Sequence, residues 1–181
     1  MYLVGRNEMI RAHRGGRPLS RGDLVALGEP GPAGVVKDFS SANKTATVLF
    51  PASVLFPPVT RERDRGPTCE LEVQQPDLVV ARHIETGSVL SVGPAVAEAL
   101  MEQGFAIDLA ESTPETVGFS LRPDESGVGS YCFVQYDRKT GGRGAEAAIL
   151  SGYRENPDFA PDPAHEPTAE DARAFARALR E

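Results

Sequence analysis

Cysteine and histidine, the most reactive side chains of this sequence, are few and far apart. They are Cys69, Cys132, His13, His83 and His165. Their spacing matches no zinc site and contains no CxxC pair. Cys132 and His83 could still meet as a nucleophile and its base, because such partners are usually distant in sequence. The position of Cys132 between Tyr131 and Phe133 instead favours a small core residue. We expect two free thiols rather than one disulfide, because small secreted scaffolds carry more cysteines.

The carboxylates and the one glycine-rich loop show no catalytic pattern either. Glu111, Glu115, Asp124 and Glu125 are scattered near expected loops, so the sequence does not indicate a carboxylate pair of the glycosidase type. Residues 141–144 read Gly-Gly-Arg-Gly but lack the spacing of a phosphate-binding loop. The sequence therefore predicts a protein that is not an enzyme, with no catalytic residue, no metal site and no cofactor.

Arginines gather in two segments and are the main candidates for binding a partner. The candidate residues are Arg11, Arg14 and Arg17 near the N-terminus and Arg61, Arg63 and Arg65 in a later loop. A basic arm can bind nucleic acid or an acidic protein surface, or it can lie against the chain's own acidic body. The net charge of -7 disfavours nucleic acid, and no aromatic residue alternates with the arginines as a stacking platform would require.

The C-terminal residues predict an amphipathic helix that must pack on something. Thr168 can cap it, with Asp171 completing a capping box. Phe175 and Leu179 lie on its apolar face, while Arg173 is expected to face solvent. A helix of about thirteen residues is marginal alone in water. It either folds back on its own chain or binds a groove of a partner, so Phe175 and Leu179 join the candidate partner-binding residues.

The elements that must position these residues are short strands in the first half of the chain. The expected strands cover residues 23–27, 34–39, 45–50, 69–73 and 77–81. Residues 69–73 alternate apolar and acidic side chains, which is typical of a half-buried antiparallel strand. Tight turns rich in glycine, proline and asparagine separate most of them. Strands at this spacing suit a small barrel or sandwich.

This pattern resembles the SH3-like barrels of the KOW and Tudor type. The resemblance covers residues 20–82 and depends on Gly22-Asp23-Leu24-Val25, on Gly34-Val35-Val36 and on the strand at 47–50, with Glu72-Val73 and residues 77–79 closing the series. The insert at residues 51–67 is longer than the usual loop. The resemblance implies a module that binds nucleic acid, peptides or partner proteins, or that braces a larger assembly. The fold alone does not choose among these roles.

The middle of the chain predicts a strand, a helix and a second strand. Residues 87–92 read as a strand, Pro94 suits the first position of a helix that ends at Gly104, and residues 105–109 read as the returning strand. This unit within residues 87–110 resembles modules of small tailed-phage structural proteins. Residues 131–136 predict a central strand. Residues 145–153 fit a helix or a strand.

Together these elements predict an α+β, mainly β chain. We expect a small N-terminal SH3-like barrel, then a small α/β segment and a C-terminal amphipathic helix. The expected divisions are a basic arm at 1–19, the barrel at 20–82, a small α+β region at 83–155, a proline-rich linker at 156–167 and the helix at 168–181. Within the first division, Met1 to Val4 can alternatively form a lead-in strand that precedes a basic loop.

The function expected from the sequence is a non-enzymatic protein–protein interaction or assembly protein that binds a protein partner or itself. The alternatives are a phage virion component such as a capsid, connector or tail accessory protein, an acidic inhibitor of the immunity type, and a nucleic-acid-binding module. The first residues contain no apolar stretch of signal-peptide length, and no run approaches the ~18 to 20 apolar residues of a membrane helix. We therefore expect a chain in the cytoplasm or assembled into a particle, without membrane contact.

Overall fold

The protein is mainly β, with antiparallel strands and a smaller helical part. The computed structural model describes residues 1–14, 17–55, 66–121, 130–136 and 148–153, together with residues 170, 173 and 174. Within these residues, the strands form two sheets, and α-helix is present in α1 (Ala52–Leu55), in α2 (Pro94–Glu102) and at residues 170, 173 and 174. The mainly-β α+β class expected from the sequence is thereby confirmed.

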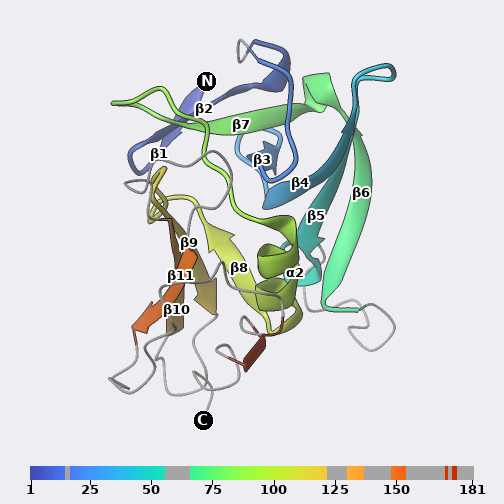
Figure 1. Ribbon diagram of the computed structural model, residues 1–181. Helices are drawn as coiled ribbons and strands as arrows, with labels where there is room; N and C mark the ends of the chain where they lie inside the picture. The colour runs from blue at the N-terminus through green and yellow to red at the C-terminus, as the bar shows by residue number, and fades with distance from the viewer. Residues whose placement is uncertain are drawn as a thin grey trace.

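Seven strands form the larger sheet, in the order β1-β2-β7-β3-β4-β5-β6 (Figure 1). They are β1 (Tyr2–Val4), β2 (Asn7–Arg11), β3 (Leu24–Leu27), β4 (Ala33–Ser40), β5 (Thr45–Pro51), β6 (Thr68–Gln74) and β7 (Leu78–His83). A 3-10 helix, η1 (Ala12–Arg14), follows β2, and another, η3 (Gln75–Asp77), joins β6 to β7. The five strands expected between residues 20 and 82 are present as β3 to β7.

The N-terminal residues belong to this sheet, which differs from the basic arm expected at 1–19. Strand β2 pairs with β7, with Asn7 opposite His83 and Arg11 opposite Val79. Asn7 and Met9 are fully buried on one face of β2. Residues 7–11 form a strand because buried Asn7 and Met9 alternate with more exposed residues. The charged residues in and around this segment made the alternation hard to recognise in the sequence.

One hydrophobic cluster takes side chains from all five strands β3 to β7 and is called here the inner cluster. Its members are Ala12, Leu19, Val25, Val36, Ala46, Val48, Phe50, Val73, Leu78 and Val80, with Leu71 packed against it. A bulge between Val36 and Asp38 interrupts the pairing of β4 with β5. At Gly34 a side chain would lie 2.6 Å from the carbonyl oxygen of Leu49, so only glycine lets these two strands approach. The five strands therefore curl around a common core.

The smaller sheet has the strand order β11-β10-β9-β8. Its strands are β8 (Phe105–Asp108), β9 (Thr116–Leu121), β10 (Ser130–Tyr136) and β11 (Ala148–Tyr153). Helix α2 precedes it, begins at Pro94 as expected, and is followed by Gly104 in the left-handed region at φ 94°. The ambiguous residues 145–153 thus contain a strand. The strand expected at 87–92 is wrong, since Val89 and Ser91 make only isolated bridges there.

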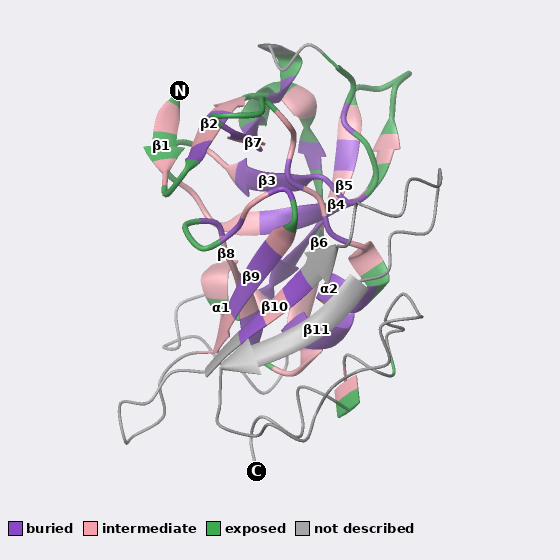
Figure 2. Cartoon of the chain, turned by 60° about the vertical axis from the view of Figure 1, so that its left-hand side comes forward, coloured by how far each residue is buried: buried purple, intermediate pink, exposed green. Residues whose placement is uncertain are grey.

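A second hydrophobic cluster, called here the outer cluster, joins the two sheets through α2. Strands β3, β4, β5 and β7 contribute residues from the face opposite the inner cluster, among them Leu24, Val35 and Leu49. These pack with Leu100 of α2 and with Phe105 and other residues of the smaller sheet. Figure 2 shows burial along both the strands of the large sheet and α2. The apolar core therefore runs across the boundary expected between residues 82 and 83.

Part of the C-terminal segment lies against α2. Residues 170, 173 and 174 are helical, and Arg173 Nε lies 3.0 Å from Glu102 Oε2. Arg173 therefore pairs with the chain's own helix while its side chain stays 42% exposed. The expected linker at 156–167 lies outside the described residues, as do Phe175 and Leu179. In the part of the chain that the structure describes, none of the helices has the length and apolar character needed to span a bilayer.

Candidate functional site

The candidate site is an open pocket of about 560 Å³ at the end of the inner cluster, called here the basic pocket. Three of its eight lining residues are basic and none is acidic. The lining residues are Ala12, His13, Arg17, Pro18, Phe39, Ser41, Lys44 and Gln75. Phe39 packs against the inner cluster with part of its ring still accessible. The pocket therefore combines positive charge with an apolar wall.

Four separate parts of the chain meet at this pocket, and backbone contacts hold two of them in register. The turn between β4 and β5 places Lys44 in the left-handed region at φ 53°. Its carbonyl oxygen accepts a 2.8 Å hydrogen bond from the amide of Gln75 in η3. On the other side, Arg11 Nη1 donates to the carbonyl oxygen of Pro76 at 3.1 Å. The β4–β5 side of the pocket is thus fixed to η3 by a backbone bond, and the nearby end of β2 is held to η3 by the Arg11 side chain.

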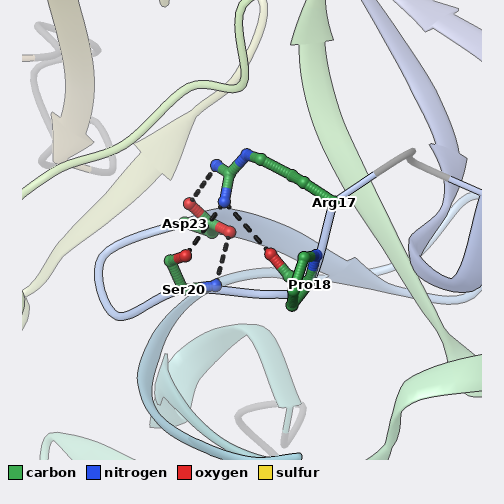
Figure 3. A network of polar contacts seen from close by, with 4 residues as sticks. All are labelled: Arg17, Pro18, Ser20 and Asp23. Atoms are coloured by element: carbon green, nitrogen blue, oxygen red, sulfur yellow. Dashed lines mark hydrogen bonds and ion pairs between the residues drawn. The ribbon is translucent and has the colours of Figure 1, made fainter.

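The guanidinium group of Arg17 pairs with the buried carboxylate of Asp23 (Figure 3). Its Nη2 donates to Asp23 Oδ1 at 2.8 Å, and its Nη1 contacts Ser20 Oγ at 3.0 Å and the carbonyl oxygen of Pro18 at 3.2 Å. Asp23 is only 2% exposed, and its Oδ2 also accepts from the amide of Ser20 at 2.8 Å. These bonds fix the conformation of residues 17–23, which lead into β3. Among the described residues, Arg17 Nε has no hydrogen-bond partner.

Several other cations of the protein are paired with carboxylates. Lys37 contacts Glu70, which raises the pKa of the lysine by accepting its hydrogen bond. Arg82 Nε donates to Glu8 Oε1 at 2.7 Å.

His13 and Lys44, by contrast, are exposed and make no ion pair with any described residue. Lys44 therefore gives the basic pocket an uncompensated positive charge in a chain whose net charge is -7. Such a surface attracts carboxylates and other anions.

The structure brings only part of the sequence-predicted site to this pocket. Arg17 lines it, and Arg14 ends the adjacent η1. Arg11 is instead directed to Glu29, at 3.3 Å. Arg61, Arg63, Arg65, Phe175 and Leu179 lie outside the described residues. No sequence pattern pointed to Lys44 or Phe39, because the fold alone brings the β4–β5 turn to the N-terminal segment.

The cysteines and histidines do not assemble a reactive centre among the described residues. Burial raises the pKa of Cys132 to about 12, so this thiol stays protonated at neutral pH and is a poor nucleophile. His83 Nδ1 lies 3.3 Å from Thr86 Oγ1. Both cysteines are free thiols, and Cys69 is partly exposed. Within the described ranges, no three histidine, cysteine or acidic side chains are grouped closely enough to hold a metal ion.

Comparison with protein-family models, with curated proteins and with solved structures gave no significant match. The function of the chain must therefore be argued from its own residues and their geometry.

Proposed function

We propose that this chain is a non-enzymatic protein–protein interaction or assembly protein. In this proposal, residues 20–82 form an SH3-like barrel of the KOW and Tudor type, and the basic pocket is its binding surface. The barrel assignment is supported by five consecutive antiparallel strands that share the inner cluster. The pocket opens at the end of that cluster, where a partner can bind loops and turns without disturbing the core.

The observation that carries the proposal is the unpaired positive charge of Lys44 in a pocket that also contains His13 and Arg17. His13 and Lys44 face solvent beside Arg17, and Arg17 is already oriented by Asp23. An oriented cation such as Arg17 needs little rearrangement when an acidic group arrives, so less conformational entropy is lost on binding. The apolar wall formed by Pro18 and Phe39 adds area that a peptide side chain can cover.

Nucleic acid is the second candidate ligand, because the same cations would attract phosphate groups. The overall charge of -7 opposes this at long range. Phe39 is the one aromatic among the lining residues, whereas single-strand binders stack successive bases on several aromatic side chains. A protein partner with an acidic segment therefore fits the pocket better.

The test uses three versions of the full chain as bait for covalent cross-linking to bound protein. They are the natural sequence, a pocket variant with His13→Glu and Lys44→Glu, and a control with Arg6→Glu. Arg6 is exposed in the β1–β2 turn, away from the pocket, so the control carries a reversal of the same kind on a distant surface. We expect the pocket variant to lose the cross-linked species and the control to keep them.

Two outcomes would count against the proposal. Equal cross-linking by all three chains would show that the basic pocket is not the binding surface. Retention of the natural chain on heparin at moderate salt, abolished in the pocket variant without any protein partner, would assign the pocket to nucleic acid instead.

A further inference from the structure

We infer that the basic pocket of one copy binds the acidic C-terminal segment, residues 155–171, of a second copy, so that copies associate head to tail. This inference rests on the proposed function and names the partner as another molecule of the same chain. It depends on two features that lie at different places on each molecule: the basic pocket and an acidic segment that is complementary to it.

The segment is acidic throughout its length. Residues 155–171 contain six carboxylate side chains and neither lysine nor arginine. The carboxylates are Glu155, Asp158, Asp162, Glu166, Glu170 and Asp171. Prolines at positions 157, 161, 163 and 167 favour an extended backbone, which lowers the entropy lost when such a segment binds. The sequence of the segment therefore spaces negative charges between prolines.

The pocket offers the matching groups. Lys44 and His13 are exposed without an ion pair to any described residue, and Arg17 presents its Nε beside them. Ala12, Pro18 and Phe39 form the apolar part of the lining. Phe159, between Asp158 and Asp162, supplies an apolar side chain that such a wall can cover. Charge and apolar area thus correspond on the two surfaces.

A second copy fits better than the same molecule because the residues that follow the segment lie on the other face of the large sheet. Arg173 contacts Glu102 at the end of α2, and α2 packs in the outer cluster. The pocket residue Phe39 packs against the inner cluster. In Figure 1 the described residues 173 and 174 lie below α2, while the β4–β5 turn lies at the opposite, upper end of the molecule. The residues that follow the segment are therefore held on the opposite side of the molecule from the basic pocket.

An interface between two different surfaces of identical molecules does not close on itself as a two-fold dimer does. Each added copy presents a new pocket and a new segment, so growth continues into open chains unless a ring forms. Because the contact depends on exposed charges, it weakens as salt screens them. We therefore expect a mass that rises with protein concentration and falls with added salt.

The experiment measures molecular mass by sedimentation for the full chain and for two complementary variants. The pocket variant carries His13→Glu and Lys44→Glu, and the segment variant carries Asp158→Asn, Asp162→Asn and Glu166→Gln. We expect the natural chain to grow with concentration, and each variant alone to associate roughly tenfold more weakly. A mixture of the two variants should form a complex of one molecule of each, because one keeps an intact segment and the other an intact pocket. The Arg6→Glu control should behave as the natural chain does.

Each result of this experiment distinguishes failure of the inference from failure of the proposed function. A natural chain that stays monomeric at every concentration overturns the inference, as does a mixture in which the two variants do not associate. If the monomeric natural chain still cross-links to another protein through its pocket, the proposed function stands and only the identity of the partner is wrong. If the pocket variant matches the natural chain in both sedimentation and cross-linking, the proposed function fails together with the inference.

Discussion

Asn7 Nδ2 donates a 2.8 Å hydrogen bond to the carbonyl oxygen of Leu109, a residue 102 positions later in the chain. A second bond of 2.8 Å from the same nitrogen reaches the carbonyl oxygen of Ser112. Asn7 is fully buried, so these bonds fix β2 of the large sheet to the loop that follows β8. The N-terminal strands are therefore attached to the smaller sheet by a polar contact inside the core.

Replacing Asn7 by alanine should destabilise the fold by about 2–3 kcal/mol, because two buried carbonyl groups lose a donor. The free energy of unfolding is measured by urea denaturation at neutral pH. Asn43→Ala is the control, since Asn43 is exposed in the β4–β5 turn and its loss should change the free energy by no more than about 0.5 kcal/mol. Equal stability of Asn7→Ala and the natural chain would contradict the structural role of this contact.

Gly5 and Gly87 form a matched pair for testing how tightly the first turn packs. Both have left-handed backbones, at φ 60° and 67°. A side chain at Gly5 would lie 2.4 Å from the carbonyl oxygen of Ala110, whereas one at Gly87 would meet nothing within 4 Å. Gly87→Ala should therefore cost only the roughly 1–2 kcal/mol of the left-handed conformation.

Gly5→Ala should cost clearly more than Gly87→Ala, by about 1 kcal/mol or above, because the clash forces the turn away from Ala110. Thermal unfolding of the two variants side by side measures the difference. Identical unfolding temperatures would mean that the β1–β2 turn does not pack against the loop at residues 108–112.

The pair Arg17–Asp23 predicts an asymmetric response to substitution. Asp23→Ala removes the acceptor of both Arg17 and the Ser20 amide, and we expect a loss of about 2–3 kcal/mol. Arg17→Met leaves the Ser20 bond in place, and the arginine side chain is 43% exposed, so solvent screening should limit its cost to about 1 kcal/mol. Urea denaturation checks both values. A larger loss for Arg17→Met than for Asp23→Ala would reverse the assignment of Asp23 as the central group.

Cys132 predicts a loss of stability at alkaline pH. Burial raises the pKa of its thiol from 9.0 to about 12, so above pH 9 the unfolded chain ionises this group while the folded chain keeps it protonated. The contribution is complete below pH 9 and is lost as the pH rises through the folded value of about 12. The slope is at most about 1.4 kcal/mol per pH unit in that window.

The natural chain should therefore lose stability more steeply above pH 9 than Cys132→Ala does, as measured by urea midpoints across the alkaline range. Cys69→Ala should follow the natural chain, since Cys69 is partly exposed. Parallel pH profiles for the natural chain and Cys132→Ala would show that this thiol is accessible in the folded state.

The sequence predicts most strongly those elements whose side chains alternate or whose ends carry a special residue. Strand β5 has β-branched residues in alternation, and α2 begins at Pro94 and ends before Gly104. Strand β2 was not predicted, because the burial of Asn7 depends on partners such as Leu109 that are distant in the chain. A pattern read within one segment does not contain that information.

The candidate site was predictable only in part, for the same reason. The cluster of arginines near the N-terminus pointed to Arg17, which does line the basic pocket. Lys44 appears in the sequence only as part of a polar turn, and Phe39 only as the end of a strand. Their meeting with Arg17 is a result of how β4 and β5 pair and how η3 contacts the β4–β5 turn.

Burial of both faces of β3, β4, β5 and β7 has a consequence for how this chain can be divided. A fragment ending at residue 82 would carry Leu24, Val35, Leu49 and Val79 uncovered on one surface. Exposed apolar area of that kind drives precipitation rather than solubility. Recombination that moved the first half into another gene would succeed only where the new neighbour brought its own helix to cover that surface.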